Sequence, residues 1–169
     1  NGGNNYVITY VGNTGTITPR AITVSAVADT KVYDGTTFSG AAPTVTAGSI
    51  VSGDSGSFGQ SFDNRNAGSG KTPTASGSID DGNGGNNYVV TYQNRADGVI
   101  LRKSITVQAS ADSKVYDGTT ASAAGPAITS GAVVGGDTAG FSQAYDNRNA
   151  GTGKTLTASG AVNDGNGGN

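Results

Sequence analysis

The alternation of apolar and polar residues along this chain predicts β-strands. Tyr6, Ile8 and Tyr10 occupy every second position, so they share one face of an extended segment at residues 6–11. Similar short runs follow, separated by Gly-Asp and Gly/Asn turns, and no window has a helical period. We therefore expect an all-β sandwich with about six or seven strands in each repeating unit. The other predicted strands are residues 16–18, 21–27, 43–46, 50–51, 72–79 and 88–92.

A repeating unit underlies this pattern. The heptapeptide Lys-Val-Tyr-Asp-Gly-Thr-Thr occupies residues 31–37 and returns letter for letter at residues 114–120, an interval of 116 − 33 = 83 residues between the tyrosines. The hexapeptide Asp-Asn-Arg-Asn-Ala-Gly at residues 63–68 returns at the same interval. The segment 99–105 that joins the units has no Gly/Ser run, so we expect the units to be joined stiffly.

Composition narrows the classes of function. With 29 glycines and 7% aromatic residues, each unit has material for only a thin core, so sheet hydrogen bonding must supply much of the cohesion. A net charge of −2 gives no electrostatic reason to expect nucleic acid or an anionic membrane surface as partner. No run approaches the roughly 20 apolar residues of a membrane helix. Because His and Cys are absent, zinc sites, thiol catalysis and Ser-His-Asp triads are excluded, and no enzyme activity is expected.

Three motifs together resemble a known family. The heptapeptide stands near the start of the unit, Asn-Ala-Gly-x-Gly-Lys follows at residues 66–71 and 149–154, and a Gly/Asn-rich turn at residues 81–86 precedes an Asn-Tyr strand. This order resembles the YDG repeat over essentially the whole chain. The resemblance implies tandem β-sandwich or β-grasp-like domains of a bacterial haemagglutinin-like adhesin. It also implies a location on the cell surface or in a secreted matrix.

The family's unit boundaries imply three segments. Residues 1–18 would be the last strands of a preceding repeat, residues 21–101 a complete repeat, and residues 104–169 a second repeat without its final strands. A sheet that lacks strands exposes an unpaired edge. We therefore hypothesise that residues 1–18 of one chain complete the second repeat of another chain, or that a longer array supplies both neighbours.

The Tyr-Asp-Gly blocks are the first candidate site. Asp-Gly favours a β-turn in which Gly takes the positive φ, and the tyrosine would pack near the junction between repeats. The alternative is a ligand-binding tip, with Asp accepting hydrogen bonds from sugar hydroxyls and Tyr stacking on the ring. We favour the structural role, as turn and junction. The residues concerned are Tyr33, Asp34, Gly35, Tyr116, Asp117 and Gly118.

The Asn-rich loops are the second candidate. They could bind a glycan or another surface ligand, with avidity from repetition, through Asp63, Asn64, Arg65, Asn66, Asp146, Asn147, Arg148 and Asn149. The Gly/Asn-rich turn supplies oxygen atoms that suit calcium, a weaker candidate, through Asp80, Asp81 and Asn83. No cofactor other than calcium is considered. A Lys–Asn isopeptide crosslink is conceivable but needs a buried lysine beside an acid, whereas lysines in such turns are normally solvated.

Two hypotheses of function follow. The first is a structural stalk or filament module of a secreted adhesin or biofilm-matrix protein, which extends an adhesive tip by stiff tandem repeats. Its partners would be neighbouring repeats and, by strand complementation, other copies of the protein. The second is multivalent binding of glycans or of a host or abiotic surface through the Asn-rich loops. Neither requires insertion into a membrane.

Overall fold

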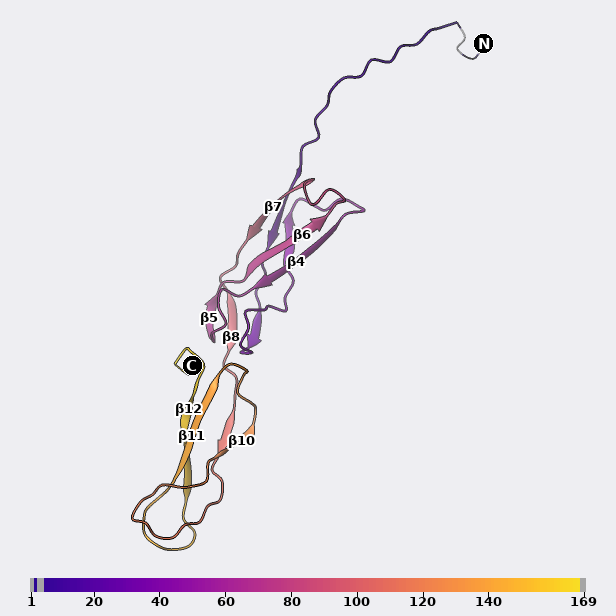
Figure 1. Ribbon diagram of the computed structural model, residues 1–169. Coiled ribbons are helices and arrows are strands. Elements are labelled where there is room, and N and C mark those ends of the chain that lie inside the picture. Colours follow the sequence, from indigo (N-terminus) through magenta and orange to yellow (C-terminus); the bar gives the residue numbers. More distant parts are fainter. Residues whose placement is uncertain (1, 3–4, 168–169) are drawn as a thin grey trace.

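The computed structural model describes residues 2 and 5–167, and every regular element within them is a β-strand. The strands form two repeats that lie end to end along one axis, and the segment before β1 projects from the far end of the first repeat (Figure 1). We call residues 20–101 the first repeat and residues 102–167 the second repeat. Residues 1, 3, 4, 168 and 169, which belong to the predicted segments at the two ends, lie outside the described residues.

The first repeat is built around β1 (Arg20–Ser25). This strand pairs in parallel with β7 (Tyr88–Gln93) and antiparallel with β3 (Thr44–Ala47), giving a three-stranded sheet. The antiparallel pair of β4 (Ser55–Ser61) and β6 (Thr74–Asp80) forms the second layer. The predicted sandwich is thereby confirmed, with a long two-stranded sheet packed on a mixed sheet.

A third, smaller sheet closes the end of the first repeat that faces the second. Its central strand, β8 (Gly98–Leu101), pairs in parallel with β2 (Thr30–Val32) and antiparallel with β5 (Gly68–Lys71). Ile100 of β8 is 1% exposed and Phe62 is 3% exposed. This sheet carries the start of the heptapeptide, so it places Tyr33 directly after β2.

The main core lies between the mixed sheet and the two-stranded sheet. Its members come from every second position of β1 and from β6 and β7, as strand alternation requires. Small residues are prominent among them, in line with the thin core that the composition predicts. The core consists of Ile22, Val24, Ala26, Ala75, Ile79 and Tyr88, with Ile50, Phe58, Val90 and Tyr92 packed against it.

The second repeat repeats only part of this arrangement. Strand β9 (Thr106–Gln108) pairs with β10 (Ala127–Ser130), and β11 (Thr138–Tyr145) forms a hairpin with β12 (Leu156–Asn163). These are the counterparts of β1, β3, β4 and β6. Residues 102–169 hold no sequence counterpart of Tyr88–Leu101, because Asn169 corresponds to Asn86. The second repeat therefore has four strands, in two two-stranded sheets, whereas the first repeat has eight strands.

Two strand predictions before β1 are wrong. Residues 6–11 and 16–18 run extended without pairing, and Tyr6 is 78% exposed and Ile17 97% exposed. A strand needs a hydrogen-bonded neighbour, and this segment projects from the end of the rod, where no described strand lies beside it (Figure 1). The short strand predicted at residues 50–51 is also absent, because these residues lead into the turn where Asp54 N donates to Val51 O at 3.1 Å.

Candidate functional site at the junction between repeats

Tyr33 connects the two repeats. It follows β2 at the end of the first repeat, and its hydroxyl donates to the carboxylate of Asp137, at 2.9 Å from Oδ2 and 3.2 Å from Oδ1. The Asp137 side chain is 2% exposed and stands in the turn before β11, where its N–H donates to the carbonyl of Val134 at 3.1 Å. A hydrogen bond to a buried carboxylate contributes more than an ordinary neutral one. Tyr33 was predicted to lie near the junction, and the structure identifies Asp137 as its partner there.

Arg65 makes the second polar contact across the junction. Its Nη2 donates to the backbone carbonyl of Asp164 at 3.0 Å and lies 3.6 Å from Oδ1 of Asp137. The guanidinium is 40% exposed, so the ion pair is partly screened, whereas the carboxylate that it faces is buried. Arg65 comes from the Asn-rich loop that was a ligand-loop candidate. In this structure it binds the neighbouring repeat.

Gly35 allows the two repeats to approach closely. Its φ is +80°, and a Cβ at this position would lie 2.8 Å from Cγ1 of Val134 in the second repeat. Any larger residue would therefore be strained in its backbone and would also press on the opposite repeat. Glycine is therefore required at this position both by the positive φ of the turn and by the close approach of the second repeat. Only the turn could be predicted from the sequence.

The electrostatics of the junction favour a neutral tyrosine. Burial and the hydrogen bond to Asp137 raise the pKa of Tyr33, while the charge of Arg65 opposes the shift. The rise means that the folded state holds the protonated phenol more tightly than water does. Tyr33 acts as a hydrogen-bond donor and not as a base.

The other residues of the heptapeptide hold the turn through hydrogen bonds to one another, an arrangement that we call the turn lock. Lys31 Nζ donates to Asp34 Oδ1 at 2.7 Å and to the carbonyl of Thr36 at 2.7 Å, and the Thr36 N–H donates to Asp34 Oδ1 at 2.9 Å. The hydrogen bond from Lys31 is the main reason that the pKa of Asp34 falls to about 2. Because these bonds engage the carboxylate, the geometry favours the turn over a sugar-binding role for Asp34.

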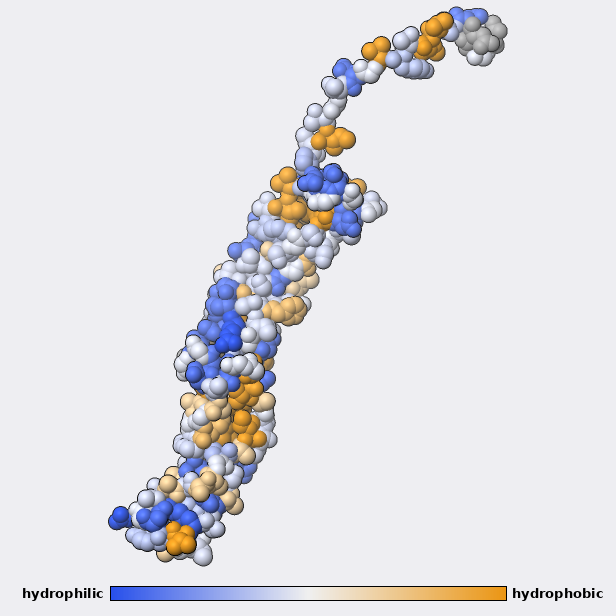
Figure 2. Space-filling view, in the orientation of Figure 1, coloured by the Kyte–Doolittle hydropathy of each residue, from blue (hydrophilic) through white to orange (hydrophobic). Residues whose placement is uncertain are grey.

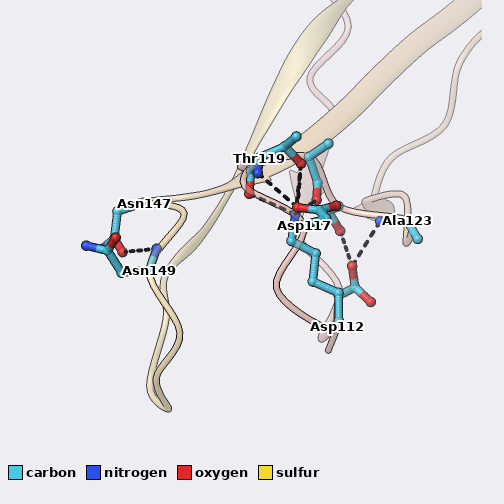
Figure 3. A network of polar contacts seen from close by, with 9 residues as sticks. Asp112, Asp117, Thr119, Ala123, Asn147 and Asn149 are labelled. Carbon is cyan, nitrogen blue, oxygen red and sulfur yellow. Dashed lines mark hydrogen bonds and ion pairs between the residues drawn. The ribbon is translucent and has the colours of Figure 1, made fainter.

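The second heptapeptide forms the same lock. Lys114 Nζ donates to Asp117 Oδ1 at 2.9 Å, and this bond is the main cause of a pKa of about 2 for Asp117. Figure 3 shows the Asp117 carboxylate receiving the backbone N–H and hydroxyl of Thr119, both at 2.9 Å. Gly118 has a φ of +78°, as the turn predicts. Tyr116, in contrast to Tyr33, is 61% exposed.

The Asn-rich loops are also held by internal bonds. Asn64 Oδ1 accepts from Lys71 Nζ at 2.7 Å and from the Asn66 N–H at 3.1 Å, and Asp63 Oδ1 accepts from the Thr72 N–H at 3.1 Å. The pair Lys71 and Asn64 is exposed, so it lacks the dry surroundings that an isopeptide crosslink needs.

The second repeat copies this loop. Asn147 Oδ1 accepts from Lys154 Nζ at 2.5 Å and from the Asn149 N–H at 3.1 Å, a contact visible in Figure 3. Asp146 Oδ1 accepts from the Asn147 N–H at 2.9 Å, and Arg148 is exposed. Glycan binding through these loops stays a prediction.

The Gly/Asn-rich turn is organised by one carboxylate. Asp81 accepts backbone N–H groups from Asn83 at 2.8 Å, Gly85 at 2.7 Å and Asn87 at 2.9 Å. Partial burial of Asp81 opposes ionisation, but these three bonds lower its pKa overall. Asp80 contributes one weak bond, to the Gly82 N–H at 3.4 Å. Within residues 5–167, no group of three or more acidic side chains is close enough to hold a metal ion. The geometry favours a turn over the weak calcium candidate.

Sequence reasoning found one side of the junction and missed the other. Val134, Asp137 and Asp164 were not among the candidate residues, although Asp137 is the central acceptor. The available signal was that Gly-Asp at residues 136–137 recurs from residues 53–54 at the repeat interval. The sequence of one unit does not indicate which loop of the next unit its Tyr-Asp-Gly turn will contact.

Comparisons with known proteins agree with these motifs. The sequence profile of the YDG domain matches residues 18–96 and again residues 102–169. Neither the curated proteins nor the solved structures include a significant match. The described residues contain no helix that could cross a membrane. Two tandem matches that together span most of the sequence, over two β-repeats with the same turn lock, place this chain in the YDG domain family.

Proposed function

We propose that this chain is a non-enzymatic stalk module of a secreted or surface-attached bacterial adhesin or matrix protein. Each repeat acts as a spacer, and the junction between repeats sets their direction. Length then grows by adding repeats, since each repeat contacts only its neighbours. An adhesive tip or another chain would provide the specificity.

The single observation that supports this role most is the junction itself. A hydrogen bond to a buried carboxylate, an arginine contact and a glycine packed against the opposite repeat all link residues that are distant in sequence. Domains joined only by a flexible linker are free to reorient. Three contacts from two loops of the first repeat restrict both bending and twisting, as a stalk requires.

The composition of the chain is compatible with the proposed extracellular location. Most polar side chains of the turns are Asn, Asp, Ser and Thr, and the net charge of −2 gives no electrostatic reason to expect nucleic acid as partner. Antibodies raised against the repeats should label intact producing cells without permeabilisation. Labelling only after permeabilisation would contradict the location.

The stalk is tested by the scaling of length with repeat number. Arrays of two, four and six identical units, each a copy of residues 20–102, should show a maximum dimension in small-angle scattering that rises linearly with the number of units. Flexibly joined units would instead approach the square-root dependence of a random chain. An array with Tyr33→Phe and Arg65→Ala in every unit is the matched control and should bend toward that behaviour.

A further inference from the structure

The Gly/Asn-rich turn of the first repeat engages almost all of its backbone N–H groups. In addition to the carboxylate bonds described above, the Asn86 N–H donates to the carbonyl of Asn83 at 3.3 Å. Of the backbone N–H groups in residues 82–87, only that of Gly84 has no hydrogen-bond partner in the structure. The available N–H therefore directly follows an asparagine.

The side chain of Asn83 is open to water. Its nitrogen donates to Oδ1 of Asn87 at 3.0 Å, and this bond is exposed, so water can replace it. The side-chain amide can then rotate toward the nitrogen of Gly84, which has a φ of +66° and no Cβ to shield it. The turn lies at the end of the first repeat that faces away from the second repeat (Figure 1), where Figure 2 shows hydrophilic residues on the surface.

The same Asn-Gly pair recurs at residues 166–167, where the first repeat lies against the turn. Arg65 contacts the carbonyl of Asp164 in that copy, yet Gly167 is exposed and Asn166 is half-buried. A neighbouring repeat therefore leaves this pair open to water. The accessibility of such a pair does not require that its turn be without a neighbour.

The Asp-Gly pairs that are followed by the same kind of turn are protected by comparison. An aspartate forms a ring with the next nitrogen readily only when its carboxyl group is protonated, because water must leave. The pKa of Asp34 and that of Asp117 are about 2, so both stay ionised at neutral pH. Partial burial of Asp81 opposes ionisation, but its backbone hydrogen bonds lower its pKa overall. The amide of Asn83 needs no such protonation.

We propose that Asn83 is a modification site, at which water converts the side-chain amide to an acid without an enzyme. Gly84 supplies the nucleophile from the backbone, and water is the co-reactant. Asparagine is among the thermolabile residues of proteins. Here an exposed amide, an unbonded N–H and a following glycine occur at one position. The proposal does not depend on the proposed stalk function.

The reaction has two steps, and its atoms balance. In the first, the Gly84 nitrogen loses its proton to hydroxide and forms a bond to Cγ of Asn83, while the bond from Cγ to Nδ2 breaks and ammonia leaves with a proton from water. In the second, water opens the resulting five-membered imide. Breaking the bond from Cγ to nitrogen gives aspartate. Breaking the bond from the main-chain carbonyl carbon to nitrogen gives isoaspartate, in which the backbone runs through the side chain. Neither step oxidises or reduces any group.

The isoaspartate product alters the turn more than the aspartate product does. It adds one carbon to the backbone at residue 83, so the N–H groups of Gly85 and Asn87 shift relative to Asp81, which accepts both. The turn leads directly into β7, whose first residue, Tyr88, belongs to the main core. We therefore expect the modification to loosen the start of β7.

Incubation of the full chain at mildly alkaline pH tests the site. Asn83, Asn86 and Asn87 lie in one tryptic peptide, residues 72–95. Fragmentation in mass spectrometry should locate aspartate and isoaspartate at residue 83. Asn86 and Asn87 should remain amides, since asparagine and tyrosine follow them instead of glycine. The conversion should speed up in proportion to the hydroxide concentration.

Asn83→Gln is the control variant. Glutamine has one more methylene group, so its ring would have six members and form far more slowly. The isoaspartate of the first repeat, detected by enzymatic methylation of the tryptic peptide, should be lost in this variant.

Two outcomes would overturn the proposal. One is that Asn83 stays an amide in the folded chain under conditions in which the isolated peptide of residues 72–95 is converted. The other is that Asn86 or Asn87 is converted as fast as Asn83.

The structural consequence has its own test. Chains that carry isoaspartate at residue 83, separated by ion exchange, should have a lower melting temperature of the first repeat than unmodified chains. Freshly prepared Asn83→Asp is the matched control, because it adds the same charge without lengthening the backbone, and its melting temperature should fall less. Equal melting temperatures of the isoaspartate form and the unmodified chain would overturn the loosening of β7, as would an equal fall in both altered forms.

Discussion

The two heptapeptides have identical letters but different surroundings. Both form the lysine-aspartate turn lock, yet only the first begins within a paired strand, and only its tyrosine meets a neighbouring repeat. Gln60 and Gln143 likewise make matching bonds to Val27 and Ser110, and each is 5% exposed. Features whose two partners are present in both repeats are therefore the same in both.

Features that rest on distant strands differ. Ile22 and Val24 are buried, whereas their counterparts Ile105 and Val107 are only half-buried. The difference isolates the contribution of β7 and β8, because the remaining sequence of the two repeats is closely similar. It teaches that a YDG unit forms its turns locally and completes its core only when the last two strands are present.

Supplying the missing strands should have the largest effect. Extending the chain after Asn169 with a copy of residues 87–103 should pair β9 on both sides and turn residues 113–115 into a strand. Amide exchange at Val107 and Val115 should slow by on the order of 10³-fold, since a folded domain is stabilised by about 5 kcal/mol or more. The measurement is hydrogen exchange at concentrations where the chain is monomeric. Unchanged exchange would mean that β7 and β8 do not account for the difference.

Removing the same contribution from the first repeat should make it resemble the second. Ile100→Ala empties the most buried position of β8 and should lower the free energy of unfolding by about 2–5 kcal/mol. Ile17→Ala, at the exposed counterpart, should leave it unchanged in the monomer. Denaturant unfolding of the two variants measures both values, and equal losses would show that burial of Ile100 is not what stabilises this sheet.

The junction should respond to Tyr33 and not to Tyr116. Tyr33→Phe leaves the buried Asp137 carboxylate without its phenol donor, which costs about 1–3 kcal/mol. The loss should appear as earlier, separate unfolding of the second repeat in calorimetry. Tyr116→Phe is the matched control and should change nothing at monomer concentrations. An equal effect of both substitutions would point to the turn rather than the junction.

High pH should weaken the junction. The folded-state pKa of Tyr33 is raised above the unfolded value of 10.0, so its contribution is fully present below pH 10.0 and is lost as pH rises through the folded pKa. The absorbance of tyrosinate should show a late step that is lost in Tyr33→Phe, which separates Tyr33 from Tyr88 and Tyr145, whose pKa values are also raised. In the Asp137→Asn variant this late step should move to lower pH. A step that stays at the same pH would mean that Asp137 is not what raises the pKa of Tyr33.

The turn locks should give the smallest and most equal effects. Asp34 and Asp117 both have a folded pKa of about 2, below the ordinary value of 3.8. Their contribution is therefore present above pH 3.8 and is lost as pH falls toward 2. Asp34→Asn and Asp117→Asn should each lower the melting temperature slightly, because both side chains are about half exposed. A much larger effect in one repeat would contradict a local lock.

The sequence predicted the features that depend on local chemistry. Alternation located β1, β3, β6 and β7, and the Asp-Gly letters located the turns. Alternation could not show that residues 6–11 lack a partner, because a strand's letters are the same whether or not another strand lies beside it. The contact of Tyr33 with Asp137 spans 104 residues, so no local pattern encodes it.

The most direct test of the rigid junction is a distance distribution between the repeats. Ser76 and Ser159 are exposed and occupy equivalent positions, so Ser76→Cys with Ser159→Cys places one spin label on each repeat. Pulsed electron paramagnetic resonance should give a single narrow distribution, which broadens when Tyr33→Phe and Arg65→Ala are added. A distribution that is already broad without those changes, and that they do not alter, would contradict the account.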